Sequence, residues 1–284
     1  MTQQQLASSL SQISVEFQSL NTVTLSRWET GTTAPSLKKK RLILHYLQKN
    51  HAFEAEVCAE LMRTRYEALY TPLSQVFSQN YQYLIGNLPE HRGAMAPRFH
   101  TLHDYADKKT HIEHLVDIEI ATNVTHYYIP SYAQMGRWCD LPTTFAVIAE
   151  RKRQHLGHMV MFKIKNRVAE EIAHHRRSEF DLRENDFCGV EERGTYYVHA
   201  LYGRSPKIAA MLNVKAYLHL FNHLKSIDNV MIFSSRADGV SLTRNYGIKT
   251  VAHGYNDRYG FKWYGMMSPV EDILFSDLVI KMAF

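Results

Sequence analysis

A predicted strand, a long helix and a second strand follow one another between Tyr196 and Ser234, and this order restricts the fold more than any other part of the chain. The β-rich runs Tyr196–Tyr202 and Val230–Ser234 flank a helical pattern over Ile208–Leu224. Strands joined by a crossover helix lie parallel in one sheet, and helices cover both faces of such sheets. Small molecules usually bind at the carboxyl ends of these strands. We therefore expect a covered α/β sheet with a ligand site at that edge.

Two further patterns extend this sheet toward the N-terminus. The β-rich runs Phe145–Ala149 and Gly157–Ile164 are separated by a charged turn over Glu150–Leu156, which predicts a hairpin. Upstream, Phe99–Tyr105 is a candidate strand and Thr110–Thr122 is an amphipathic helix. The α/β domain is therefore expected to begin near residue 99.

The first fifty residues contain patterns of short helices. Thr2–Leu10 and Asn21–Glu29 are helical, with Asn21 as the N-cap of the second helix. Ser36–Leu47 forms a third helix whose apolar stripe can cover the first two. The next segment is helical in pattern and either packs on these helices or pairs with a second subunit. We expect an all-α bundle over residues 1–50, a helical connector over 51–98 and the α/β domain over 99–284.

Composition places the chain among globular proteins of a reducing compartment. Its 284 residues, 45% of them hydrophobic, can form two domains with a real core. Cys58, Cys139 and Cys188 lie far apart without a CxxC spacing, so neither disulfides nor a zinc–cysteine site is expected. No long apolar run and no signal-peptide pattern occur. We therefore expect a cytoplasmic protein without a membrane partner.

The sequence gives little reason to expect a metal. His111 and His114 lie one helical turn apart, which suits two ligands on one face of a helix. No matching third or fourth ligand follows from the sequence. We therefore expect no metal site.

Positive charge gathers in the N-terminal segment. The net charge of the whole chain is +5, and the first fifty residues hold six basic side chains against two acidic ones. Lysine and arginine release condensed counterions from nucleic acids, so such a segment suits a phosphate-facing surface. A solvated basic face is the alternative, and charge alone does not separate the two.

The order of residues in this segment resembles the phage-repressor type of helix-turn-helix, the family of lambda repressor and Cro. The resemblance rests on the motifs TQQQLA at residues 2–7, LSRWETG at 25–31 and PSL at 35–37. It implies that Asn21–Glu29 enters the major groove of double-stranded DNA, where Thr22, Val23 and Arg27 face base edges. It also implies that Gln3 and Asn21 hold phosphates.

The larger C-terminal part resembles the GNAT superfamily of acyltransferases. The resemblance is carried by FAVIAERKRQHLGHMVMF from Phe145, YYVHALYGRSPKIAAMLNVKAYLHLF from Tyr196 and VMIFSSRADGVSLTRNYGIKTV from Val230. It implies a mixed sheet flanked by helices, and acetyl-CoA or another acyl-CoA as the ligand. The fold class expected for the whole chain is thus α+β in two domains, a helix-turn-helix bundle followed by a GNAT-like α/β domain.

The GNAT resemblance also implies where the coenzyme binds. In that family a loop before a helix presents backbone amides to the coenzyme pyrophosphate, and here the loop spans Arg204–Ala210. Lys207 stands where the family pattern has its first glycine, which removes the freedom that close backbone approach requires. The residues implied in coenzyme binding are Arg204, Ser205, Lys207, Ile208, Ala209 and Ala210.

A second departure concerns catalysis. Thr243 stands where the family often has a tyrosine that protonates the departing thiolate, and Tyr246 lies three residues later. Acyl transfer needs a base for the amine and a proton source for the thiolate, and the candidates are Glu119, His199 and Tyr246.

Together these patterns favour a DNA-binding transcriptional regulator whose GNAT-like domain senses a metabolite or mediates homodimerisation, rather than an enzyme. An active N-acyltransferase that transfers an acyl group from acyl-CoA to an amine is the alternative. A purely structural protein with a decayed fold is a third hypothesis.

Overall fold

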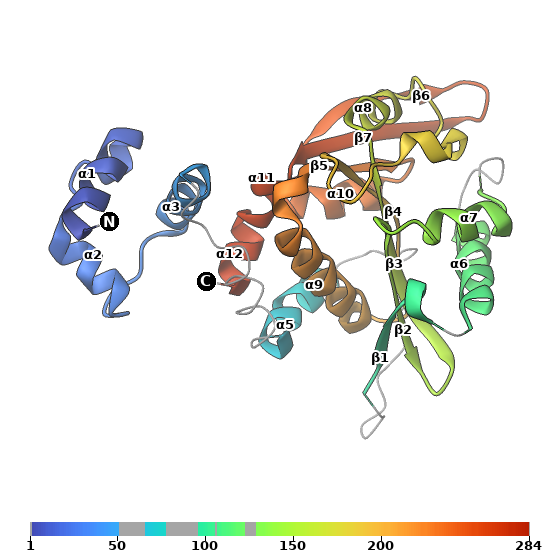
Figure 1. The fold of residues 1–284 in the computed structure, drawn as a ribbon, viewed down its shortest axis with the longest axis horizontal. Coiled ribbons are helices and arrows are strands. Elements are labelled where there is room, and N and C mark those ends of the chain that lie inside the picture. Colours follow the sequence, from blue (N-terminus) through green and yellow to red (C-terminus); the bar gives the residue numbers. More distant parts are fainter. Residues whose placement is uncertain (1, 51–65, 78–95, 106, 123–128, 284) are drawn as a thin grey trace.

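The apolar runs of the sequence form the centre of one mixed sheet (Figure 1). The computed structural model describes residues 2–50, 66–77, 96–105, 107–122 and 129–283. In this part of the chain the strand order is β1-β2-β3-β4-β5-β7-β6, with only β4 and β5 parallel. The strands are β1 (Arg98–Thr101), β2 (Phe145–Arg151), β3 (Gln154–Ile164), β4 (Gly194–Gly203), β5 (Ile227–Ser234), β6 (Thr250–Asn256) and β7 (Phe261–Pro269).

The predicted hairpin is confirmed and is tighter than expected. Strands β2 and β3 pair down to Arg151 and Gln154, so the turn shrinks to Lys152 and Arg153. Both residues have positive φ, 51° and 64°, as a two-residue turn that follows the strand twist requires.

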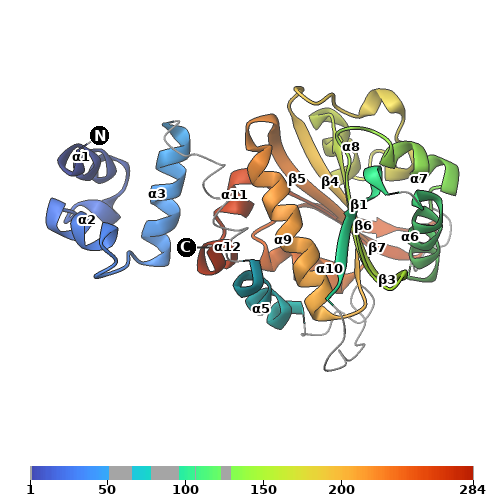
Figure 2. The ribbon, with the colours of Figure 1, turned by 60° about the horizontal axis from the view of Figure 1, so that its bottom comes forward.

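Side-chain alternation along the strands divides the core between two layers of helices (Figure 2). Val147 and Met159 pack in one apolar cluster, whereas their neighbours Ile148 and Val160 pack in the other. The first face is covered by α5 (Tyr66–Phe77), α9 (Pro206–Asn222), α10 (Ala237–Asn245), α11 (Val270–Leu274) and α12 (Asp277–Ala283). The second face is covered by α6 (Lys108–Thr122), α7 (Tyr132–Cys139) and α8 (Asn166–Ala173). The expectation of a mixed sheet flanked by helices is confirmed.

The strand–helix–strand unit formed by β4, α9 and β5 is also confirmed. The two strands are parallel, but their pairing ends at Tyr197 and Met231. Beyond this point β4 continues to Gly203 and β5 to Ser234 without a ladder between them. The sheet therefore opens at the carboxyl ends of its two central strands.

The three N-terminal helices form where the sequence predicts them. They are α1 (Gln3–Ile13), α2 (Thr22–Glu29) and α3 (Leu37–Lys49). Thr2 and Gln5 form a reciprocal capping box on α1, and the Asn21 side chain accepts a hydrogen bond from the Thr24 amide of α2 at 2.8 Å. These local contacts explain why such short helices begin where they do.

The third helix does not close the expected bundle. Leu44 of α3 is buried in the cluster that also contains α9 and α11, and Gln48 donates a hydrogen bond to Glu271 at 2.8 Å. His45 packs edge-on against Phe275 with ring centroids 5.2 Å apart. The apolar stripe of α3 thus covers the large body, and Figure 1 shows α3 between α1–α2 and α11–α12. A helix-turn-helix bundle of the phage-repressor type is not confirmed.

The expected connector and domain boundaries are only partly described. Residues 51–65 and 78–95 lie outside the described part of the chain, and α5 packs on α9. The division into residues 1–50, 51–98 and 99–284 stays a prediction. None of the described helices is long and apolar enough to cross a membrane.

Candidate functional site

A β-bulge in β4 lies beside the opening of the sheet. Val198 pairs with Met161 of β3, whereas Ala200 pairs with the preceding residue, Val160, so His199 is the extra residue. The imidazole of His199 contacts the rings of Trp138 and Phe162, which belong to the cluster under α6, α7 and α8. The bulge therefore turns His199 toward this face of the sheet.

Two pockets meet where β4 and β5 separate. One lies on the α6–α8 face with a volume of about 440 Å³, and the other lies on the α9–α10 face with about 140 Å³. Four residues line both of them: His199, Leu201, Phe233 and Ser234. The opening in the sheet thus connects a larger polar pocket with a smaller apolar one.

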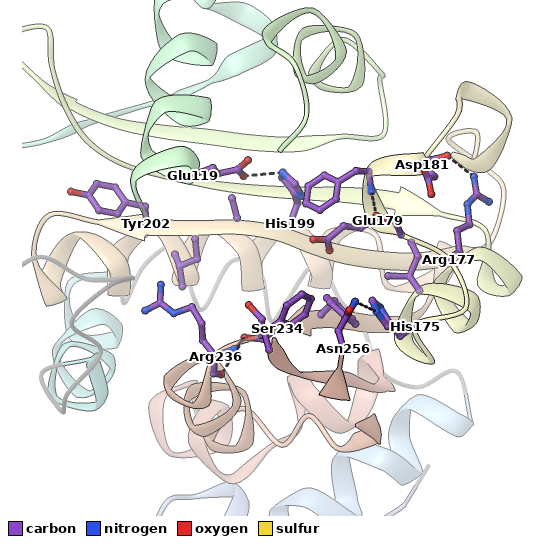
Figure 3. Close-up of a pocket in the computed structure, with 18 of the residues that line it drawn as sticks. Glu119, His175, Arg177, Glu179, Asp181, His199, Tyr202, Ser234, Arg236 and Asn256 are labelled. Carbon is purple, nitrogen blue, oxygen red and sulfur yellow. Dashed lines mark hydrogen bonds and ion pairs between the residues drawn. The ribbon is translucent and has the colours of Figure 1, made fainter. Parts of the chain in front are cut away.

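His199 pairs with Glu119 in the larger pocket, as Figure 3 shows. His199 Nε2 lies 2.9 Å from Glu119 Oε1, and only 4% and 16% of the two side chains are exposed. Burial alone would lower the pKa of His199, but the Glu119 carboxylate outweighs it and raises that pKa above its usual value. The structure thus brings together two of the three predicted catalytic candidates, one from α6 and one from β4.

A second carboxylate approaches the same histidine. Glu179 begins the short 3-10 helix η3 (Glu179–Asp181) and accepts a hydrogen bond from the Tyr197 hydroxyl. Burial raises the pKa of Glu179 to about 7, although His199 and the Tyr197 hydrogen bond oppose the shift. The pocket therefore holds one imidazole between two carboxyl groups, one of which exchanges a proton near neutral pH.

Basic side chains lie around the rest of the pocket. Arg177 is held by Asp186 and Glu171, and Arg236 lies 2.6 Å from Asp238. Figure 3 shows Arg236, Ser234 and Asn256 across the pocket from Glu119 and His199. A charged ligand therefore meets acidic groups beside His199 and the guanidinium of Arg236 on the opposite wall.

The third catalytic candidate, Tyr246, lies on the other side of the opening. It lines the apolar pocket together with Thr243, and it is 6% exposed. The Thr243 hydroxyl donates to the Val240 carbonyl at 2.9 Å, so it is already used within α10. Tyr246 packs edge-on against Tyr217 of α9. Tyr246 therefore belongs to the pocket lining although it stands three positions after the expected tyrosine.

The predicted coenzyme loop leads into α9. Ser205 is the N-cap, and its side chain accepts a hydrogen bond from the Ile208 amide, while the Ala209 amide donates to the Ser205 carbonyl. The side chains of Ile208, Ala209 and Ala210 are buried in the core. Among these predicted residues, Arg204 and Lys207 are the two charged ones at the start of the helix. An anion that used the Ile208 amide would have to displace the Ser205 hydroxyl.

The residues predicted to contact DNA divide into two groups. Thr22, Val23 and Arg27 are exposed on α2. Gln3 instead donates a hydrogen bond to Glu29, and Asn21 caps its own helix. The two predicted phosphate contacts are therefore engaged within the protein.

Sequence reasoning missed several residues of the polar pocket. Glu179 and Arg177 lie in a charged segment without periodicity, and Arg236 precedes α10. One sequence signal lies nearby, in the pattern VAEEIA of α8, whose apolar residues recur on one face as in a packed helix. The turn that follows this helix forms part of the pocket wall.

Comparisons with known proteins give matches among solved structures. No protein-family model and no curated protein matches the sequence. The structure is similar to FeeM, an N-acyl amino acid synthase from uncultured soil microbes, with 13% identity, a TM-score of 0.43 and coverage of 62% of this chain and 92% of that one. It is also similar to the ribosomal-protein-S18-alanine N-acetyltransferase from Escherichia coli, with 6% identity, a TM-score of 0.40 and coverage of 62% and 94%. An aminoglycoside 6'-N-acetyltransferase complexed with coenzyme A is similar at 12% identity and a TM-score of 0.40, with coverage of 62% and 97%.

These comparisons correct the main functional prediction. The solved structures named above are N-acyltransferases, and each match covers about 62% of this chain. The prediction of a DNA-binding transcriptional regulator is therefore wrong, and the findings favour the alternative, an N-acyltransferase. Neither double-stranded DNA nor a second copy of the chain is supported as a partner.

Proposed function

We propose that this protein transfers an acyl group from an acyl-CoA thioester to an amine. The observation that carries the proposal is the opening between β4 and β5, where a polar pocket and an apolar pocket share His199. A two-substrate reaction needs two binding volumes that meet at one point, because the reacting atoms must approach to about 3–3.5 Å. The coenzyme A complex of a similar acetyltransferase also supports this choice of donor.

In this proposal each substrate binds on one side of the opening. The apolar pocket is lined by Met161, Ala216, Leu220 and other aliphatic side chains, and so it suits the acyl chain of the donor. The polar pocket holds Glu119 and Glu179, and so it attracts a protonated amine.

The reaction requires three proton movements. The ammonium loses one proton to become a neutral amine, which attacks the thioester carbonyl carbon. The C–N bond forms and the nitrogen loses its second proton, while the C–S bond breaks and the thiolate takes up a proton. The Glu119–His199 pair is the base in this proposal, and the carboxylate stabilises the imidazolium that results. Tyr246, in the pocket on the donor side, is the proposed proton source for the thiolate.

The start of α9 is the proposed site of the coenzyme pyrophosphate. Arg204 and Lys207 supply positive charge there, and the helix N-terminus adds its partial charge. The other predicted residues carry no charge and form the N-cap and the first turns of α9: Ser205, Ile208, Ala209 and Ala210. Binding would replace the Ser205 cap of the Ile208 amide by a phosphate oxygen, a helix-capping contact worth about 1 kcal/mol.

Glu119→Gln tests the proposal, because it keeps the shape of the side chain and removes its charge. Thiol release from a panel of acyl-CoA donors with amine acceptors should fall by about 10²-fold or more in kcat. The control is Glu113→Gln on the same helix, where the side chain is 44% exposed and pairs with Lys109. Failure of the wild-type chain to turn over any donor, with no acyl-CoA-induced thermal shift, would refute the proposal.

A further inference from the structure

Three histidines form a cluster where α6 meets the β2–β3 hairpin. His111 and His114 lie on consecutive turns of α6, and His155 lies at the start of β3. One ring nitrogen of each lies within 4.8 Å of the other two. The ring centroids are 6.1, 5.7 and 5.8 Å apart. We propose that these three side chains bind a divalent transition-metal ion, for which Zn²⁺ fits best.

Unpartnered nitrogens support a ligand at this position. His111 is only 5% exposed, and the Nδ1 atoms of His111 and His155 are buried without a hydrogen-bond partner. An unsatisfied buried polar atom costs about 1–3 kcal/mol, so a partner at this position would stabilise the protein. A metal ion would satisfy both atoms at once.

The other nitrogen of His155 is held by a neighbouring histidine, and the other nitrogen of His111 lies near a carboxylate. His155 Nε2 lies 3.0 Å from His158 Nδ1, and His111 Nε2 lies 3.8 Å from Glu150 Oε2. Metal-binding histidines usually hold their second nitrogen in this way, since the outer contact fixes the tautomer and the ring orientation. The arrangement therefore assigns Nδ1 of both residues as the ligand atoms.

Glu150 supplies the compensating charge. It is 8% exposed, and it accepts a hydrogen bond from the Tyr105 hydroxyl at 2.7 Å while His100 Nε2 lies 3.3 Å away. A buried carboxylate beside a divalent ion offsets part of the ion's charge. Imidazole ligands with a neighbouring carboxylate suit zinc better than magnesium or calcium, which prefer oxygen ligands.

The geometry needs only a small adjustment. Zn–N bonds of about 2.0–2.1 Å place tetrahedral ligands about 3.4 Å apart. His114 is exposed and can turn toward the two buried rings, and solvent can fill the fourth position. The ion would then join the hairpin to α6, the helix that carries Glu119. The sequence shows two of these ligands, and the fold adds the third from forty residues away.

Zinc titration of the full chain, purified without a histidine tag, tests this site. We expect one Zn²⁺ per chain with a micromolar or tighter Kd, and tetrahedral absorption bands when Co²⁺ replaces it. His114→Ala and His155→Ala should each weaken binding by about 100-fold, and Glu150→Gln by about 10-fold. The exposed His103, close in sequence but outside the cluster, provides His103→Ala as the control, which should bind like the wild type.

Two results would overturn the site. One is wild-type affinity in His114→Ala and His155→Ala, and the other is no zinc uptake by a wild-type chain that circular dichroism shows to be folded. Because His114 is exposed, its variant should fold normally, so lost binding there reports on the ligand itself. All these measurements are made without acyl-CoA, so their failure leaves the proposed acyl transfer unaffected.

Discussion

Glu179 shows how one buried carboxyl group links folding to pH. Its pKa is raised to about 7 by burial, so the folded protein keeps the acid protonated over a range in which the unfolded chain ionises it. A raised pKa contributes stability below the unfolded value of about 4.5, and this stability is lost as the pH rises through about 7. Above pH 7 the Glu179 side chain is a carboxylate beside His199, and it can accept a proton there.

Glu179→Gln should therefore change the pH dependence of stability. The variant keeps an acceptor for the Tyr197 hydroxyl but cannot ionise, so its free energy of unfolding relative to wild type should rise by on the order of 1–3 kcal/mol between pH 5 and pH 8. Urea denaturation at the two pH values measures the difference. Glu184→Gln, at an exposed position, should show no such change, and an equal response of both variants would contradict the argument.

Tyr246 offers a second test on a single residue. If its hydroxyl protonates the departing thiolate, Tyr246→Phe should lower kcat by about 10²-fold with little change in KM. Tyr217→Phe is the matched control, because Tyr217 lines the same pocket and contacts Tyr246. Equal loss in both variants would indicate a packing effect instead of proton transfer.

The predicted catalytic residues were only partly recognisable in the sequence. Glu119 and His199 are recognisable in the sequence as residue types that can move a proton, but their pairing across eighty residues depends on the bulge in β4. Glu179 has no sequence signal, since its raised pKa comes from its burial in the fold and not from a local motif.

At the level of elements, the close contact of β7 with α8 restricts which side chain can stand at the contact point on β7. A Cβ added to Gly265 of β7 would lie 1.7 Å from the carbonyl oxygen of Ala173, the last residue of α8. Backbone atoms cannot yield as a flexible side chain can, so the helix end must stay beside a glycine. This contact positions the turn after α8, which forms the wall of the polar pocket.

Gly265→Ala should lower the free energy of unfolding by about 3 kcal/mol, because α8 must move away from the strand. Thermal denaturation with circular dichroism measures the loss. Gly189→Ala introduces a methyl group with no atom within 4 Å and should change stability by less than about 0.5 kcal/mol. Similar melting of the two variants would show that the sheet and α8 adjust more easily than their packing indicates.

Elements with a strong local pattern were predictable, and those without one were not. The hairpin and the β4–α9–β5 unit follow from apolar runs separated by turn residues. The separation of β4 from β5 has no such signal, since it depends on how both strands twist against their neighbours.

On the scale of the whole molecule, the buried apolar residues of the first two helices are distinct from the main core beside the sheet. Ala7, Leu10, Phe17 and Leu25 are buried among α1, α2 and the short helix η1 (Val15–Phe17), whereas Leu44 of α3 is part of the main core. The sequence predicts all three helices but not this division, because the apolar stripe of α3 suits both the surface of the first two helices and the surface of α11 and α12. The larger surface of α11 and α12 is the one it covers.

Leu10→Ala should therefore unfold the first two helices without disturbing the sheet. A fully buried leucine costs about 2–5 kcal/mol when truncated, which is large for so small a cluster. Hydrogen exchange should speed up across residues 3–29 and stay slow in β3 and β4. Val23→Ala, at a position that is 58% exposed, should leave both regions unchanged. Faster exchange in the central strands of Leu10→Ala would show that the first two helices and the sheet unfold together.

The additional residue in β4 has a consequence for how this chain can vary. Removing position 199 would turn the bulge into an even ladder with β3, in which Ala200 and the residues up to Gly203 keep the partners they already have. The strand would then stay paired while the pocket lost its imidazole. A related chain that lacks this one residue should therefore keep the fold without the histidine.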